Sequence, residues 1–233
     1  MTYLKYPASD YFNNIIPLEG KDVLDWGCNH GNFLINMPKV SSYTGVDIDP
    51  DVIKTMSKTH NKHDWLYYKH HNPQYSDYHS ESQWPPLETY DVICAFSVFT
   101  HTSFKEMMTT TCKLKSHLND NGSLLQTYMP NTISTLESIF SHRSKLFQEH
   151  DTDLITKCVT QSEVSTVAIH IDSNQLYLFP NVQDFPQFYH SLYYLTFYNE
   201  EWLADKTGGE IVDITNKYDS GIMSIQRCLR QEK

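Results

Sequence analysis

Short apolar runs alternate with helical patterns through the first half of the chain, and this alternation restricts the fold more than any other feature. Such runs are typical of buried strands, and helices between them are typical of parallel pairing. The runs span residues 21–26, 43–48, 66–69, 90–96 and 124–129, and the helical patterns span 32–37, 50–56 and 103–118. The order predicts an α/β fold with a mostly parallel sheet, whose strand C-terminal ends share the edge where ligands bind.

The composition argues against several classes of function. The 233 residues fit one domain, and the 39% hydrophobic share supplies a packed core rather than a disordered chain. The formal net charge of −10 argues against nucleic-acid binding and against an anionic membrane surface. The five cysteines form no C-x-x-C pair, and the paired histidines lack further ligands at recognisable spacing. No apolar run reaches the roughly 18 residues that cross a bilayer. We therefore predict a soluble, cytoplasmic protein without a metal site.

The alternation breaks between Asn131 and Tyr198. Two β-like runs in this segment, 164–171 and 175–179, flank Asp172-Ser173-Asn174 and predict a hairpin. We expect one domain over residues 1–233, with residues 131–198 inserted into it as a cap, and a role of the insertion in a homodimer is left open. The remaining predicted elements are a helix over 200–207 that ends at Gly208, and strands over 210–214 and 221–229.

A glycine-bearing turn follows the first apolar run. The stretch Val23-Leu24-Asp25-Trp26-Gly27-Cys28-Asn29-His30-Gly31 resembles the first motif of the class I S-adenosylmethionine-dependent methyltransferases, an acidic residue followed by three alternate glycines. Asp25, Gly27 and Gly31 match, and Asn29 replaces the middle glycine, a position where asparagine tolerates the positive φ that the turn requires. The resemblance implies that the turn, including Cys28, binds S-adenosylmethionine, with Asp25 facing the cationic methionine end.

Further motifs similar to this family follow in the same order. In Gly45-Val46-Asp47-Ile48-Asp49-Pro50, Asp47 matches the acidic residue that binds both ribose hydroxyls, and Ile48 would lie against the adenine. Residues 90–101 resemble the fourth-strand motif, in which Phe96 and Ser97 would flank the cofactor, and 118–125 resemble the turn before the fifth strand. Together the motifs imply the family's three-layer, Rossmann-like sheet of seven strands, mostly parallel with the last strand antiparallel.

The loop after the third predicted strand contains Asn72-Pro73-Gln74-Tyr75. A similar tetrad holds a flipped base in some nucleic-acid methyltransferases, but there it follows the fourth strand. The position therefore favours a loop that flanks the adenine, with Asn72 as a hydrogen-bonding partner of the cofactor.

The resemblance implies methyl transfer to an oxygen or nitrogen of a small molecule by in-line displacement, with residues 131–198 choosing this acceptor. His101 lies just beyond the fourth strand, and an imidazole with a pKa near 6.5 is a suitable proton acceptor for a hydroxyl or ammonium nucleophile. A capping or substrate-shaping role for His101 is the alternative.

Other functions were weighed against this one. A nicotinamide dinucleotide needs G-x-G-x-x-G, whereas three residues separate Gly27 from Gly31, and no Lys-Ser/Thr follows Gly31 to cradle a phosphate. Methylation of a protein or nucleic acid is opposed by the acidity of the chain. A catalytically inactive cofactor-binding or scaffold protein of the same fold remains the alternative, opposed by retention of both Asp25 and Asp47.

Overall fold

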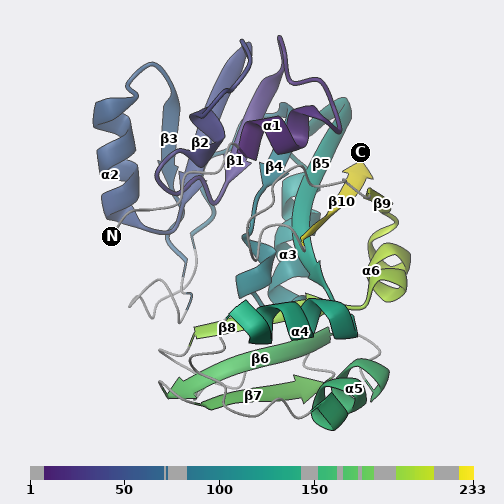
Figure 1. The fold of residues 1–233 in the computed structure, drawn as a ribbon. Helices are drawn as coiled ribbons and strands as arrows, with labels where there is room; N and C mark the ends of the chain where they lie inside the picture. Colours follow the sequence, from purple (N-terminus) through teal and green to yellow (C-terminus); the bar gives the residue numbers. More distant parts are fainter. Residues whose placement is uncertain are drawn as a thin grey trace. The chain divides into compact units, whose positions relative to one another are not determined.

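A computed structural model describes residues 8–70, 72, 83–142, 152–161, 165–172, 175–180, 193–212 and 226–233 (Figure 1). The chain divides into two compact units. Unit 1 comprises Met1–Val98, Cys112–Gln126 and Arg230–Lys233, and unit 2 comprises Phe99–Thr111 and Thr127–Leu229. The predicted cap falls within unit 2, and its residues 143–151, 162–164, 173–174 and 181–192 lie outside the described residues, as do Pro73, Gln74 and Tyr75.

Unit 1 is built on parallel strands whose central members are almost completely buried. β1 (Asp22–Trp26) and β4 (Tyr90–Ala95) each bury all but one residue, which explains why their sequences are nearly continuous apolar runs. β1 pairs in parallel with β4 and with β2 (Ser42–Asp47). β3 (Asp64–Tyr67) and β5 (Leu118–Pro130) complete the order β3-β2-β1-β4-β5. Because these strands are parallel, β1, β2 and β4 end at the same edge.

The second helix of unit 1 begins after a capping residue. In α2 (Pro50–Thr59), which contacts β2 and β3, the Asp49 carboxylate accepts hydrogen bonds from the N–H groups of Asp51 and Val52 at 2.8 and 3.2 Å. α1 (Ala8–Asn13) contacts η1 (Asn32–Leu34). The helix expected over 32–37 is only this short 3₁₀ turn, because Ile35 is extended and Asn36 adopts φ 57°.

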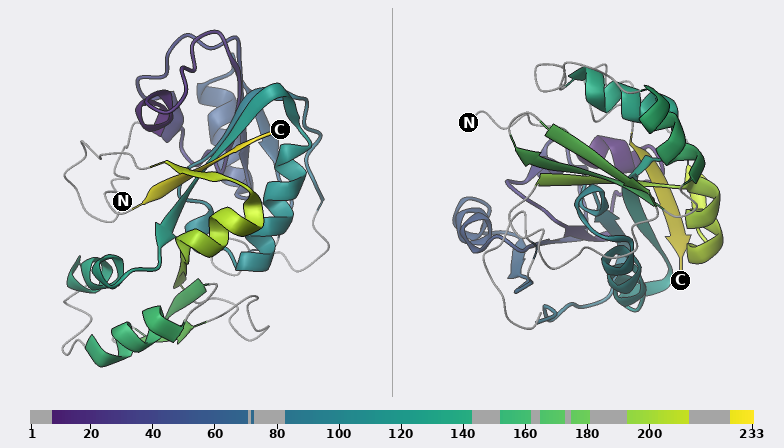
Figure 2. Two further views of the ribbon diagram at one scale, coloured as in Figure 1. Left: turned by 90° about the vertical axis from the view of Figure 1, so that its right-hand side faces the viewer. Right: turned by 90° about the horizontal axis from the view of Figure 1, so that it is seen from below.

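Unit 2 contains the predicted hairpin and one strand that the sequence did not reveal. β6 (Ser165–Asp172) and β7 (Gln175–Pro180) pair antiparallel, which confirms the hairpin. β8 (Tyr193–Tyr198) was not predicted; it pairs antiparallel with β6 and parallel with the end of β5 (Figure 2). The other elements are η2 (Phe99–His101), α3 (Phe104–Lys115), whose last residues belong to unit 1, α4 (Ile133–His142), α5 (Thr152–Gln161), α6 (Glu200–Thr207) and β9 (Glu210–Val212). β10 (Arg227–Glu232) overlaps the end of the strand expected over 221–229. Residues 221–225 of that expected strand lie outside the described residues. The last residues of β10 belong to unit 1.

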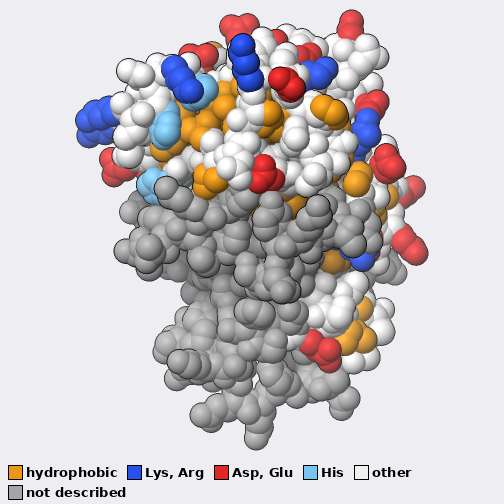
Figure 3. Space-filling view, turned by 45° about the horizontal axis from the view of Figure 1, so that its top comes forward, with side chains coloured by type: hydrophobic (Ala, Val, Ile, Leu, Met, Phe, Trp, Pro, Cys, Tyr) orange, Lys and Arg blue, Asp and Glu red, His pale blue; other side chains and the backbone are white. Residues whose placement is uncertain are grey.

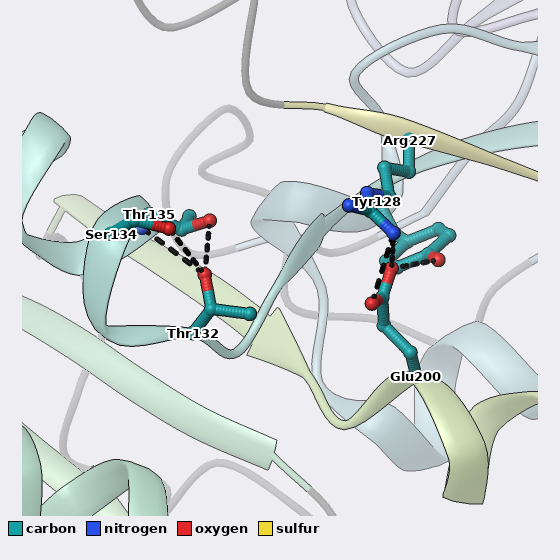
Figure 4. Close-up of polar contacts among 6 residues, drawn as sticks. All are labelled: Tyr128, Thr132, Ser134, Thr135, Glu200 and Arg227. Atoms are coloured by element: carbon teal, nitrogen blue, oxygen red, sulfur yellow. Dashed lines mark hydrogen bonds and ion pairs between the residues drawn. The ribbon is translucent and has the colours of Figure 1, made fainter. Parts of the chain in front are cut away.

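Two polar clusters fix helix starts in unit 2 (Figure 4). The Glu200 carboxylate, at the start of α6, accepts a hydrogen bond from the Tyr128 hydroxyl at 2.8 Å and forms an ion pair with Arg227 at 3.2 Å. At the start of α4, the Thr132 hydroxyl accepts from the N–H of Thr135 at 3.2 Å. The first cluster thus joins β5, α6 and β10.

The predicted fold class is confirmed. The pairing order β3-β2-β1-β4-β5 in unit 1 and β5-β8-β6-β7 in unit 2 gives a Rossmann-like α/β sheet that is mostly parallel with an antiparallel end. The helix over 200–207 is also confirmed, and Gly208 ends it with φ 63°. Within the described part of the chain, no helix combines the length and the apolar character needed to span a bilayer.

Candidate functional site

The turn after β1 is held against the end of β2 by backbone hydrogen bonds. The N–H groups of Gly27 and Cys28 both donate to the Val46 carbonyl, at 2.8 and 2.9 Å, and the N–H of Gly31 donates to the Cys28 carbonyl at 3.0 Å. Gly27 and Gly31 adopt φ 81° and 78°, and Asn29 adopts φ 45°. The expectation that asparagine accommodates the left-handed geometry of the missing glycine is therefore confirmed.

Gly27 also lacks space for a side chain. A Cβ atom at this position would lie 2.4 Å from Cγ2 of Val98, which follows β4 in the same unit. The first glycine of the motif is therefore required by both its backbone conformation and its close approach to Val98.

Asp47, at the end of β2, ties this turn to the next helix. Its Oδ2 accepts a hydrogen bond from the N–H of Asn29 at 2.8 Å, and its Oδ1 accepts from the N–H of Asp49 at 3.0 Å. Burial raises the pKa of this carboxyl, and the backbone hydrogen bonds oppose the rise. Each carboxylate oxygen has a further lone pair, so the group retains acceptor capacity for two adjacent hydroxyls.

Asp25, on β1, is a buried carboxyl that accepts a hydrogen bond from the Tyr43 hydroxyl at 2.7 Å. Burial raises the pKa of Asp25 to about 7; the hydrogen bond from Tyr43 opposes this rise, and the charge of Asp47 adds to it. The two acidic residues, taken from separate sequence motifs, are therefore close enough to repel each other. A desolvated pair of carboxylates favours a cationic ligand.

The fourth-strand candidates follow β4 directly. The ring of Phe96 lies 5.4 Å from that of Tyr11 and 5.8 Å from that of Phe12, both in edge-to-face geometry on α1. Ser97 adopts φ 60°, a conformation that non-glycine residues seldom occupy outside functional turns.

The remaining cofactor candidates also belong to unit 1. Burial raises the pKa of the Cys28 thiol well above its usual value, so this side chain is a neutral packing group rather than a nucleophile. Ile48 is half-buried directly after Asp47, and Asn72 is buried. Unit 1 thus contains every residue predicted for the cofactor.

His101 is half-buried at the end of η2 and belongs to unit 2, so the structure does not group it with the cofactor candidates. Two side chains of β8 hold the backbone on either side of it. The Tyr198 hydroxyl donates to the carbonyls of Phe99 and Thr102 at 3.0 and 3.2 Å, and the Thr196 hydroxyl donates to the Thr102 carbonyl at 2.7 Å. Both side chains are fully buried.

Removing these hydroxyls tests whether they jointly hold the loop. Tyr198→Phe and Thr196→Val should each lower the free energy of unfolding by about 1–3 kcal/mol. Thr102 keeps one of the two donors in either single variant, so the double variant should lose more than the sum of the single losses. Urea denaturation of the four proteins measures this difference, and strictly additive losses would contradict the shared role.

The sequence missed Tyr43, Thr196 and Tyr198, because nothing local marks their distant hydrogen-bond partners. It also missed Asn131, the first residue after β5. The residue is 8% exposed, and neither Oδ1 nor Nδ2 has a hydrogen-bond partner within the described part of the chain. An unpaired buried amide costs about 1–3 kcal/mol, so Asn131 is suited to bind a polar ligand.

The residues of unit 1 fit S-adenosylmethionine. A cationic ligand offsets the burial of Asp25 and Asp47, and the free lone pairs of Asp47 suit a ribose diol. The turn between them is fixed in its left-handed conformation at Gly27, Asn29 and Gly31, so its backbone is set before a ligand binds.

Comparison with known proteins also points to S-adenosylmethionine. A family model described as a methyltransferase domain matches residues 2–169. An S-adenosylmethionine-dependent methyltransferase from Clostridium acetobutylicum ATCC 824 is similar in structure, with a TM-score of 0.54 at 11% identity, over 99% of this chain and 91% of that chain.

Two further solved structures share the fold and were determined with S-adenosylhomocysteine. The magnesium protoporphyrin IX methyltransferase of Synechocystis PCC 6803 has a TM-score of 0.51 at 14% identity, over 97% of this chain and 80% of that chain. The glycopeptide N-methyltransferase MtfA has a TM-score of 0.52 at 6% identity, over 98% of this chain and 90% of that chain. No curated protein matches the sequence. The chain therefore belongs to the methyltransferase domain family and is an S-adenosylmethionine-dependent methyltransferase of the class I fold.

Proposed function

We propose that this enzyme methylates an oxygen or nitrogen atom of a small molecule by direct in-line displacement. The observation that carries the acceptor class is the interior of unit 2, where the described buried polar side chains are all uncharged. They are hydroxyls and amides: Thr100, Thr102, Ser103, Thr110, Thr111, Thr127, Asn131, Thr135, Thr196 and Gln226. Such groups suit a neutral acceptor that forms hydrogen bonds.

Asn131 gives this proposal a specific anchor. It is the first residue of the predicted cap, and its N–H donates to the Tyr198 carbonyl at 2.8 Å, which fixes its backbone beside β8. The unpaired amide offers two donors and one acceptor. We assign it to hydrogen bonding with the acceptor molecule.

The surface charge supports a small acceptor rather than a polyanion. On the face shown in Figure 3, Lys and Arg side chains are interspersed with Asp and Glu over the described surface and form no continuous basic stripe there. The name of one neighbour of the same fold points the same way, since that protein acts on magnesium protoporphyrin IX.

In this proposal each unit contributes separate chemistry. When bound, the cofactor supplies an electrophilic methyl group. Asp47 and the turn from Gly27 to Gly31 hold its nucleoside, and Asp25 faces its cationic end. His101 accepts the proton from the acceptor hydroxyl or ammonium, and residues 131–198 choose the acceptor and exclude water.

The His101→Ala variant tests the proton acceptor. It should lower kcat by about 10²- to 10⁴-fold, as expected for loss of a general base, with little change in cofactor affinity. The acidic limb of the pH–rate profile should also disappear in this variant. Full activity, or reduced activity with an unchanged pH profile, would assign His101 to shaping the site instead.

The acceptor class is tested with cofactor carrying an isotopically labelled methyl group. The enzyme is incubated with sets of phenols, alcohols and amines and, in parallel, with peptides and RNA, and labelled products are identified by mass spectrometry. We expect label only in the small-molecule sets. Label in peptide or RNA would overturn the acceptor class, and cofactor binding without any transfer would favour the inactive scaffold.

A further inference from the structure

We propose that Tyr43 is a positioning residue of the cofactor site, whose hydroxyl orients the Asp25 carboxyl and sets the pH range over which cofactor binding releases one proton. The inference rests on the proposed contact of Asp25 with the cationic end of the cofactor. It does not depend on the acceptor, on His101 or on turnover.

The register of β1 and β2 brings the two side chains together. Val23 pairs with Tyr43 and Asp25 pairs with Gly45, so Asp25 and Tyr43 lie on the same face of the sheet. Gly45 has no side chain, so the flanking residues of β2 on this face, Tyr43 and Asp47, are the ones that can reach the carboxyl, and Tyr43 carries the hydrogen-bond donor. The Tyr43 oxygen lies 2.7 Å from Oδ2 of Asp25, and the two residues are 2% and 3% exposed.

The packing around Tyr43 fixes the position of its hydroxyl. The ring lies 5.8 Å from Phe33, 5.1 Å from His63 and 5.6 Å from Trp65, measured between ring centroids. Burial raises the pKa of the Tyr43 phenol well above its usual value, so the phenol stays protonated and acts as the donor. A donor held in this way favours the ionised form of its acceptor.

The described titratable groups around this pair provide no positive charge at neutral pH. Asp47 on β2 and Cys28 in the turn act electrostatically on the pair, and Cys94 on β4 pairs with Asp25 across the sheet. His63 packs against the Tyr43 ring, and burial lowers its pKa, so it is neutral near pH 7. Within the described part of unit 1, the counter-charge for Asp25 therefore has to come from a ligand.

The direction of the coupling follows from these surroundings. The pKa of Asp25 is raised to about 7, so below this pH the carboxyl is mostly protonated and neutral in the free protein. A cationic ligand stabilises the carboxylate and lowers this pKa. Binding then releases a proton below about pH 7, and affinity increases with pH until Asp25 is ionised in the free protein. Without the Tyr43 hydroxyl, the pKa of Asp25 in the free protein is still higher. The pH range over which affinity increases therefore moves to higher pH.

Isothermal titration calorimetry with S-adenosylhomocysteine, which carries the cationic ammonium, measures this coupling. Titrations from pH 6 to 8 in phosphate and in imidazole, buffers that differ in ionisation enthalpy, count the protons released. For the wild-type protein we expect release of nearly one proton at pH 6 and almost none at pH 8. For Tyr43→Phe we expect release to persist to higher pH, and a rise of about one unit in the Asp25 pKa should lower affinity at pH 7 about fivefold.

Two further variants separate the coupling from packing. Tyr90→Phe removes the hydroxyl of another buried tyrosine of unit 1, and it should leave the proton count unchanged. Asp25→Asn should abolish proton release. A wild-type proton count in Tyr43→Phe, or persistent release in Asp25→Asn, would overturn the inference. Wild-type binding with no proton release would overturn it too while leaving the proposed function intact, whereas a wild-type protein that binds no S-adenosylhomocysteine would overturn both.

Discussion

The Asp47→Ala variant should bind S-adenosylhomocysteine at least about 100-fold more weakly than the wild-type protein while remaining folded. The Asp47 carboxylate is the predicted acceptor for two ribose hydroxyls, and each hydrogen bond to a charged group contributes about 1.5–3 kcal/mol, where 1.4 kcal/mol equals a tenfold change in affinity. The variant also loses the bond to the N–H of Asn29, so the turn itself is less well held. Calorimetric titration measures the affinity, and circular dichroism confirms the fold.

Asp49→Ala is the matched control. This neighbouring carboxylate caps α2, so its removal should lower the free energy of unfolding by about 1 kcal/mol. Asp49 still offers its backbone N–H to Asp47 in this variant, and cofactor affinity should stay within about twofold of the wild-type value. Equal losses of affinity in the two variants would remove the ribose assignment of Asp47.

Gly27→Ala should have the largest effect on stability, lowering the free energy of unfolding by about 2–5 kcal/mol. An alanine at φ 81° costs about 1–2 kcal/mol. Its Cβ would also lie 2.4 Å from Cγ2 of Val98, and overpacking of this kind costs about 1–3 kcal/mol. Urea denaturation measures the loss, and titration with S-adenosylhomocysteine should show weaker binding because the turn is displaced.

Gly20→Ala separates the conformational cost of a positive φ from the cost of the close contact with Val98. Gly20 has φ 72°, but a Cβ there would have no atom within 4 Å, so only the conformational cost of about 1–2 kcal/mol should remain. Val98→Ala removes the atom that the new Cβ would approach. The double variant Gly27→Ala/Val98→Ala should therefore lose less free energy of unfolding than the sum of the losses in the two single variants. If Gly27→Ala and Gly20→Ala were equally destabilised, the close contact with Val98 would have no energetic importance.

Much of the fold was predictable because its signals are local. β1 and β4 are short, mostly apolar runs, and Gly208 marks the end of α6. β8 could not be predicted in the same way. Its pairing depends on β5 and β6, which lie far away in the sequence. The helix expected over 32–37 was wrong because Asn36 leaves the helical conformation.

In the candidate site, too, the residues that could be predicted lie in local motifs, and the residues that were missed have partners far away in the sequence. Asp25, Gly27, Asn29 and Asp47 were recognised because each lies within a short motif at a strand end. The Tyr43 hydroxyl is 18 residues from its acceptor, and the Tyr198 hydroxyl is 96 and 99 residues from its two acceptors. Only the folded sheet brings these donors and acceptors together, so sequence spacing contains no signal for them.

The attachment of β8 to the His101 loop has a consequence for exchanging caps between relatives. The strand that closes the cap also supplies the hydroxyls that support the candidate base. A graft that replaces residues 131–198 as a block would therefore alter both the proposed choice of acceptor and the proposed proton transfer. A graft whose downstream junction precedes Tyr193 retains those hydroxyls, so new acceptor preferences can be installed without disturbing the loop.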